Sequence, residues 1–463
     1  MTIVRAACAW LVVFGLAACS AVSTNATANA TLPQARALVT GSRGTSGSIQ
    51  HVVIVIQENR SFDNLFATFP GADGATEGKM STGRTVKLTE AALQFPCDFG
   101  HSRSGYLKSY DKGKMDGFNL EGGSAKCPGQ AGKRPYQYVN PSDIAPYWDI
   151  AGQYVLADHM FQTQGSGSFT AHQDLIAGGT AINVRESLVD FPSHSPWGCD
   201  APAGTVTSLV KGNGTSPQPV KLIYLYHKGP FPCMTYATMR DLLDAKSVTW
   251  KYYTPTIAGS GAIWNAFDGI SAVRYGSEWE TNVISPETEI FSDISGGTLP
   301  SVSWVIPDNT NSDHPGSGED KGPSWVASVV NAIGESSYWP NTAIVVVWDD
   351  WGGFYDHVAP PFRDNYGGLG FRVPMLVISP YARQGVSGPG YVSSTQYEFG
   401  SILKFVEDVW GLGRLNTTDT RARSIVDCFD FTQQPRPFTA IPSEYSVRYF
   451  ENERPSGQPV DSE

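Results

Sequence analysis

The sequence predicts an α/β fold in which helices cover a central, mainly parallel sheet. Two segments, 51–56 and 342–348, are continuous and rich in β-branched residues, as in strands whose two faces are both buried. Apolar residues recur at helical spacing in 324–333 and 399–409. Strands that alternate with helices along a chain predict an α/β/α sandwich.

The remaining elements follow from weaker signals. Residues 373–378 form a third strand candidate, because Pro374 near the start is tolerated at a strand entry. Residues 301–306 are a weaker fourth candidate. Gly411 provides a stop for the second helix. Residues 83–139 are rich in Gly, Lys, Tyr and Ser without clear periodicity, so we expect long loops there rather than a separate domain.

The composition limits the class of protein. The chain has 463 residues, of which 41% are hydrophobic and 17% charged, so a large core is expected and wholesale disorder is excluded. The formal charge is −11 and no run of Lys or Arg occurs, which disfavours a nucleic-acid partner. An acidic surface also disfavours passive adhesion to anionic lipid. The 12% of aromatic residues fits an aromatic-lined groove or simply a large core.

The first 19 residues have the pattern of an export signal. Arg5 supplies the positive charge, and the apolar run 6–18 is too short to span a bilayer. The run ends in Leu-Ala-Ala-Cys, which resembles a bacterial lipobox and implies acylation of Cys19. The Ser-, Ala-, Thr- and Asn-rich residues 20–48 are then a flexible tether.

This pattern predicts an exported periplasmic or cell-surface lipoprotein whose contact with a membrane is made through Cys19 alone. The alternative is an ordinary signal peptide that is cut after Ala28 or Ala30 and leaves a secreted protein. The rest of the chain, 49–463, is expected to be one catalytic domain.

Cysteine usage agrees with export, because an oxidising compartment permits disulfides. Without Cys8 in the signal and Cys19 at the anchor, five cysteines remain: Cys97, Cys127, Cys199, Cys233 and Cys428. Pairing of neighbours would join the first two and the next two and leave Cys428 buried or free, although sequence alone does not establish connectivity. No CxxC spacing occurs, which disfavours a thiolate metal site.

Oxygen ligands follow the two best strand candidates. In open α/β sheets, ligands bind beyond the carboxyl ends of the strands. Glu58 and Asn59 follow the first strand, and Asp349 and Asp350 follow the second. Either pair alone is as readily a helix cap or a solvated charge, but together they favour a divalent-cation site. Asp349 and Asp350 can share an ion only if the strand breaks there, and the following glycine pair 352–353 supplies that freedom.

A small-residue loop, 165–172, leads into the stretch 175–177, which is predicted to be helical. A hydroxyl at a helix N-terminus lies among free N–H groups that bind phosphate, and a nearby metal would make it a nucleophile. The alternative is a plain capping serine. The glycine spacing around Ser166 and Ser168 does not match a GxSxG nucleophile elbow.

Histidines are scarce, with eight in the chain, so their positions are informative. His101, His314 and His357 each lie in a motif-like segment, the last just beyond the acidic pair. Imidazoles suit phosphate binding and general acid catalysis near neutral pH, although any one alone is more often structural. His51, at the start of the first strand, is interpreted as structural.

The motifs together resemble the bacterial phosphoesterase family, which contains phospholipases C and certain acid phosphatases. Ile-Gln-Glu-Asn-Arg-Ser-Phe-Asp at 56–63 is similar to the opening motif of the family, and 348–358 is similar to its second signature. Asp-His-Pro at 313–315 and the stretches 371–374 and 379–381 are similar to later family segments. The resemblance runs from about 49 to 430 in the family's order.

The resemblance implies an alkaline-phosphatase-like α/β/α sandwich with long loops over the active site. It implies a metal held by Glu58, Asn59, Asp349 and Asp350, a nucleophile at Ser168, and phosphate-binding or proton-donating roles for three histidines, His101, His314 and His357. The Gly-Ser-Phe-x-x-His form of the loop at Ser168 is nearer to the acid phosphatase form than to the phospholipase form.

The sequence therefore predicts a metal-dependent phosphoric ester hydrolase that acts through a phosphoseryl intermediate. Ca²⁺, Mg²⁺ and Mn²⁺ all fit oxygen ligands. Monoester and diester substrates, lipid or soluble, stay open. One alternative is a metal-independent serine esterase with a Ser–His–acid triad, which chelation would leave active. Another is a non-catalytic surface lipoprotein that binds a phosphorylated or sugar ligand.

Overall fold

A computed structural model of the chain describes residues 47–212, 222–259, 262–317, 320–361, 368–386, 388 and 390–455. The predicted signal sequence, Cys19 and almost all of the predicted tether lie outside these residues and stay predictions. Within the described ranges, no helix combines the length and the apolar character needed to cross a membrane.

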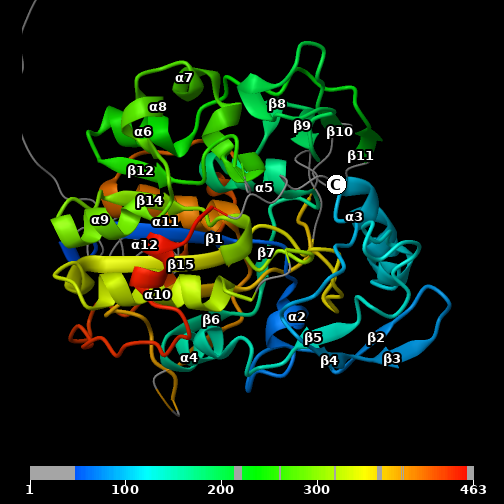
Figure 1. The fold of residues 1–463 in the computed structure, drawn as a ribbon, viewed down its shortest axis with the longest axis horizontal. Helices are drawn as coiled ribbons and strands as arrows, with labels where there is room; N and C mark the ends of the chain where they lie inside the picture. The colour runs from blue at the N-terminus through cyan, green and yellow to red at the C-terminus, as the bar shows by residue number, and fades with distance from the viewer. Residues whose placement is uncertain are drawn as a thin grey trace, which may run out of the picture. The chain divides into compact units, whose positions relative to one another are not determined.

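One large sheet forms the centre of the fold (Figure 1). Within the described residues it has eight strands, in the spatial order β13 (Val283–Ile284), β12 (Trp250–Tyr253), β14 (Val302–Val305), β1 (His51–Gln57), β15 (Thr342–Trp348), β16 (Met375–Ile378), β6 (Val155–Ala157) and β17 (Tyr391–Ser393). Only β16 runs against the others in this sheet. The predicted mainly parallel sheet is therefore confirmed.

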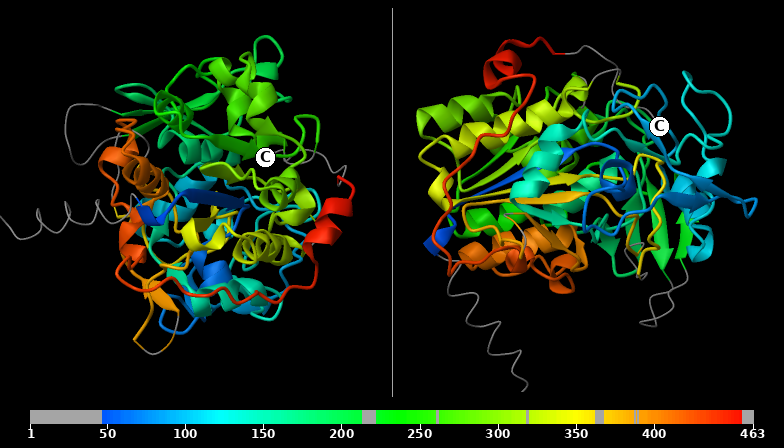
Figure 2. Two further views of the ribbon diagram at one scale, coloured as in Figure 1. Left: turned by 90° about the vertical axis from the view of Figure 1, so that its left-hand side faces the viewer. Right: turned by 90° about the horizontal axis from the view of Figure 1, so that it is seen from below.

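Helices cover both faces of this sheet. The longer ones are α4 (Ala145–Gln153), α5 (Ser168–Ala177), α9 (Glu289–Gly296), α10 (Gly322–Gly334) and α11 (Phe399–Trp410). Helix α10 packs with α4, α9 and the C-terminal α12 (Val447–Asn452), whereas α11 packs with α5. The right-hand view of Figure 2 shows α9 and α10 on one side of the strands and α11 on the other. These are the three layers that the alternating pattern predicts.

The four predicted strands and both predicted helices are present, each within two residues of its expected bounds. All seven residues of β15 are buried, which explains its continuous apolar character. Helix α11 ends at Gly411, whose φ of 61° is left-handed, as the stop signal predicts. Residues 83–139 contain short elements: β3 (Thr85–Lys87), β4 (Thr89–Ala91), α3 (Arg103–Tyr110) and β5 (Gln137–Val139).

A second, antiparallel sheet lies between α5 and α6 (Met239–Ala245) in the chain. Within the described residues its strands follow the order β11 (Leu222–Leu225), β10 (Ser208–Gly212), β9 (Glu186–Val189) and β8 (Ala181–Asn183). Its strands are short, and β8 and β11 are only partly buried, so the sequence showed no pattern strong enough to predict them.

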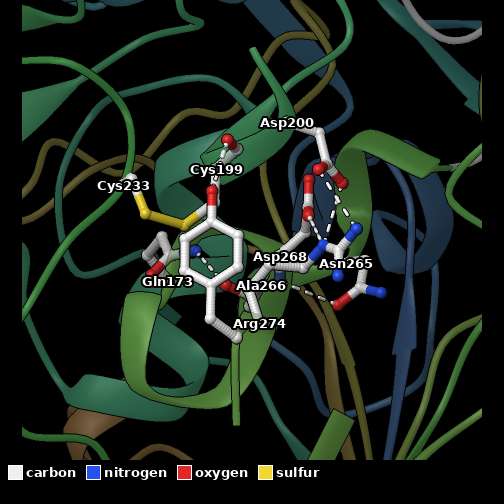
Figure 3. Close-up of a disulfide and its surroundings, with 9 residues drawn as sticks. Gln173, Cys199, Asp200, Cys233, Asn265, Ala266, Asp268 and Arg274 are labelled. Atoms are coloured by element: carbon white, nitrogen blue, oxygen red, sulfur yellow. Dashed lines mark hydrogen bonds and ion pairs between the residues drawn. A yellow bond between two sulfur atoms is a disulfide. The ribbon is translucent and has the colours of Figure 1, made fainter. Parts of the chain in front are cut away.

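Both disulfides pair neighbouring cysteines, Cys97 with Cys127 and Cys199 with Cys233, and Cys428 is a buried free thiol. Figure 3 shows the second disulfide beside Arg274, whose guanidinium lies between two carboxyl groups. Its Nε donates to Asp200 Oδ2 at 2.9 Å and lies 3.3 Å from Asp268 Oδ1. Burial, together with Asp200, raises the pKa of Asp268 to about 8. This region is thus joined by a covalent bond and by an ion pair.

A buried arginine ties together the loops that follow β1 and β15. The Arg372 guanidinium donates to Asp356 Oδ1 at 2.9 Å and to Asp63 Oδ1 at 3.3 Å, and all three side chains are fully buried. Its Nη1 also donates to the backbone carbonyls of Asp73 and Asp158 at 2.8 Å. Four segments that are distant in sequence therefore depend on one cation.

We predict that Arg372→Met lowers the free energy of unfolding by about 3–5 kcal/mol, because it leaves two buried carboxyl groups without their cation. Urea denaturation measures the change. Arg383→Met is the matched control, since Arg383 is exposed and its loss should change the free energy by less than about 0.5 kcal/mol. A loss below about 1 kcal/mol for Arg372→Met would show that the network contributes little to stability.

Candidate active site

The register of β1 and β15 brings the predicted metal ligands together. The two strands pair in parallel from His51 opposite Thr342 to Gln57 opposite Trp348, so they end at the same level. The ladder continues for one more bond, from Asp349 N to Gln57 O at 3.0 Å. Strand β15 ends at Trp348. The side chains of Asp349 and Asp350 are therefore not forced to point to opposite faces of the sheet, as predicted. Glu58, Asn59, Asp349 and Asp350 are all fully buried.

Asn59 is held in an unusual backbone conformation at the centre of this group. Its φ is 57°, a left-handed value that Asn adopts more readily than most residues, and its N–H donates to Asp349 Oδ1 at 3.0 Å. Gly352 has φ of 59°, and a Cβ placed there would lie 2.1 Å from the Asn59 carbonyl oxygen. The glycine pair therefore supplies the predicted backbone freedom. The group that closely approaches Gly352 is the Asn59 backbone rather than a substrate.

Ser168 is the first residue of α5, and its hydroxyl points toward this group. The helix N-cap is Gly167, with extended backbone, so Ser168 is not the capping residue that the alternative interpretation assumed. Its Oγ lies 3.3 Å from Asn59 Oδ1 and 3.3 Å from Asp350 Oδ2. The structure thus brings the predicted nucleophile to two of the four predicted metal ligands.

His101 holds the Asn59 amide in one orientation. His101 Nδ1 lies 2.7 Å from the Phe99 carbonyl and must donate to it, which leaves the Nε2 lone pair of a neutral ring to accept from Asn59 Nδ2 at 3.1 Å. The Asn59 oxygen consequently faces Ser168. In this arrangement, His101 Nε2 is a hydrogen-bond acceptor, whereas the predicted proton-donating role requires a donor.

His314 lies beside His101, with ring centroids 6.3 Å apart. Its Nδ1 lies 2.7 Å from the Pro315 carbonyl. Asp98, His101 and His314 have ligand-type atoms within 4.8 Å of one another. The His101 nitrogen nearest to Asp98, at 3.7 Å, is nevertheless the one that donates to Phe99. In this tautomer the His101 nitrogen nearest to Asp98 carries a proton and has no lone pair to offer a metal ion.

His172 belongs to the site, although the predicted site residues do not include it. Its Nε2 lies 2.7 Å from Glu58 Oε1 and 3.8 Å from Asp349 Oδ2. Burial lowers the pKa of His172 to about 4, and Asp349 only partly opposes this, so the ring is neutral at pH 7 and donates to Glu58. The spacing of four residues from Ser168 was the available signal, because residues i and i+4 of a helix share a face.

The donor set fits a divalent cation. Glu58, Asp349 and Asp350 are three fully buried carboxyl groups in one site, and the neutral His172 brings no positive charge. Among the described residues, Asp349 Oδ2 has no hydrogen-bond partner. Burial of ionised carboxylates is costly unless a cation lies beside them. Carboxylate and amide oxygens are the ligands that Ca²⁺, Mg²⁺ and Mn²⁺ prefer.

His357 lies in the Arg372 network instead of beside Ser168. Its Nδ1 lies 2.8 Å from Asp63 Oδ2, and its Nε2 lies 3.3 Å from Asp73 Oδ1. Among the described residues, no recorded contact joins it to Ser168 or to the acidic pair. The structure therefore brings together seven of the eight predicted site residues and sets the eighth in a separate cluster.

A wide cleft of about 1280 Å³ adjoins this site at His314. Asp98 also contributes to its lining. The remaining lining residues are Asn309 and residues from the loops around 99–104 and 122–126, from 190–197, from 224–227 and from 315–317. Among the predicted site residues, His314 is therefore the one that a substrate in this cleft meets directly.

The chain is similar to a family of known proteins. The model of the Phosphoesterase family matches residues 49–413. The chain is 25% identical to the non-hemolytic phospholipase C of Pseudomonas aeruginosa over 86% of this chain and 60% of that protein. It is 28% identical to phospholipase C A of Mycobacterium tuberculosis over 84% of this chain and 78% of that one. A solved structure from Vibrio parahaemolyticus in the alkaline phosphatase superfamily has a TM-score of 0.37, with 11% identity over 81% of this chain and 71% of that chain.

The family match covers most of the chain, including both strand-end motifs, the Ser168 loop and the His314 segment. The chain therefore belongs to the Phosphoesterase family and is a hydrolase that acts on phosphoester bonds.

Proposed function

We propose that the chain is a metal-dependent phosphoric ester hydrolase in which Ser168 is the nucleophile. The observation that carries this proposal is the position of Ser168 Oγ, 3.3 Å from both an Asn59 and an Asp350 oxygen, at the N-terminus of α5. An ordinary surface serine needs no such surroundings. Buried carboxyl groups that face a hydroxyl are costly in free energy, and catalysis explains their presence.

In the proposed reaction, Ser168 Oγ attacks phosphorus while its proton passes to Asp350 Oδ2. The N–H groups at the start of α5 bind the phosphoryl oxygens, since they have no partner within the helix and carry partial positive charge. The bond from phosphorus to the leaving oxygen breaks, and a phosphoseryl group remains. Water then attacks phosphorus, and Ser168 recovers its proton as phosphate or a phosphomonoester departs.

The proposal assigns different roles to the three predicted histidines. His314 lines the cleft, so we propose that its Nε2 donates a proton to the leaving oxygen. His101 acts through Asn59, whose amide it orients toward Ser168. His357 is assigned to the Arg372 network and not to the reaction.

Glu58, Asn59, Asp349 and Asp350 would hold the cation, which when bound lowers the pKa of the Ser168 hydroxyl and polarises the phosphoryl oxygens. The donor set also argues against the alternative of a metal-independent serine esterase. Such an enzyme needs an imidazole on its serine, whereas the recorded partners of Ser168 Oγ are an amide and a carboxyl oxygen.

The phospholipase C relatives suggest a phosphodiester substrate. We test this by comparing p-nitrophenyl phosphate with phosphatidylcholine and by identifying the products, with and without a chelator. The expected result is turnover of at least one substrate, lost on chelation and restored by a divalent cation. Phosphocholine and diacylglycerol would identify a phospholipase C, and turnover of the monoester alone would identify a phosphatase. Full activity in the chelator would overturn the metal-dependent proposal.

Ser168→Ala is expected to lower kcat by at least about 10³-fold, since no other hydroxyl occupies the position of the nucleophile. Acid-quenched enzyme should carry one phosphoryl group on Ser168 in the wild type and none in the variant, as measured by mass spectrometry of peptides. Ser104→Ala, in the cleft lining, is the control and should keep near wild-type kcat. A labelled Ser168→Ala protein would contradict the assignment.

His172→Leu is expected to raise the half-saturating metal concentration by about 10- to 100-fold, because Glu58 loses the donor that orients it. His172→Gln, which retains an N–H near the Nε2 position, should recover part of this loss. Metal content after dialysis provides a readout that does not depend on turnover. Equal metal content in the Leu variant and the wild type would show that His172 has no part in holding the ion.

A further inference from the structure

We propose that the cleft selects phosphoesters that carry a planar ring, such as nucleoside phosphates, by stacking the ring on an aromatic wall. The wall consists of Tyr224, at the end of β11, and of Tyr226 and His227, which follow the strand. This inference rests on the proposed function, since the wall would act on the part of the substrate that lies beyond the reacting phosphate.

The wall presents ring surface to the cleft. Tyr226 is 61% exposed and lines the cleft. Its ring stacks on His227, with centroids 3.8 Å apart and an interplanar angle of 22°. The Tyr224 ring lies 6.0 Å from Tyr226. An exposed ring in such a row can extend the stack with a planar group from the substrate.

The wall is anchored to the loop that carries the nucleophile. Tyr224 donates its phenolic hydroxyl to Asp190 Oδ2 at 2.6 Å, and the Asp190 N–H donates to Ser166 Oγ at 2.7 Å. Ser166 lies two residues before Ser168. Asp190 Oδ1 also accepts from the Arg103 N–H at the start of α3. A surface that is held by buried hydrogen bonds is preformed, so a ring that binds to it does not have to order it first.

The disulfide in Figure 3 restrains the same region. Cys199 follows the 190–197 segment of the cleft lining and is bonded to Cys233, which follows the 224–227 segment. The disulfide therefore connects the 190–197 segment of the cleft lining with the segment that carries the wall. The stacking surface and the Ser168 loop thus belong to one restrained unit.

The chemistry of the lining disfavours a buried acyl chain. Among the described lining residues there is no Leu, Ile, Val or Met, so such a chain would meet mainly serine, glycine and aromatic side chains. Stacking is the interaction that this wall offers most directly.

The test compares adenosine 5′-monophosphate with ribose 5-phosphate, which share the same ester linkage and differ in the base. The wild type is expected to show a kcat/KM for the nucleotide that is roughly tenfold above that for the sugar phosphate, since stacking of a base on an aromatic side chain is worth about that factor or more. Tyr226→Ala should remove most of this preference, and Tyr226→Phe should retain it.

Ile223→Ala is the matched control, because Ile223 is on the same strand, is 49% exposed and is not among the cleft-lining residues. It should leave the ratio unchanged. Equal kcat/KM values for the two substrates in the wild type, or an unchanged ratio in Tyr226→Ala, would overturn the inference and leave the proposed function intact. Absence of turnover with every phosphoester would instead defeat the proposed function itself.

Discussion

The parallel pairing of β1 with β15, in one continuous register, is the constraint on which the site depends. Because Gln57 lies opposite Trp348, the residues that follow each strand emerge at the same level and on the same edge of the sheet. A shift of the register by one residue would exchange the faces of a whole strand and separate Glu58 from Asp349. The buried, β-branched character of both strands makes such a shift costly, so the core of the sheet specifies the distance between the ligands.

The second constraint is the burial of charge. Carboxyl groups in the interior need a compensating cation, and the chain meets this need in two different ways. Asp63 and Asp356 receive the guanidinium of Arg372, which makes their cluster a structural one. Glu58, Asp349 and Asp350 have a neutral His172 and a serine hydroxyl among their neighbours, and under the proposed function an ion from solution would compensate their charge. This contrast separates the candidate catalytic cluster from a superficially similar neighbour.

The two largest sheets among the described residues have different roles. The large sheet and the helix α5 position the reacting groups, and their geometry depends on buried apolar packing. The small antiparallel sheet, with its partly exposed strands, forms one wall of the cleft and is joined to the Ser168 loop through Asp190 and Ser166. Residues on such a wall can change without disturbing the core, which is the usual way in which one fold serves several substrates.

The sequence by itself determined the layered α/β fold, the two central strands and the residues that follow them, because continuous β-branched runs and strand-end motifs are local signals. The loop 165–172 also singled out Ser168 as the candidate nucleophile, and that role stays a proposal. The roles of the histidines were decided only by the tertiary structure: His172 joins Glu58, His101 orients Asn59 and His357 pairs with Asp63. Each of these three side-chain partners is more than 40 residues away in the chain, so no local pattern encodes the pairing.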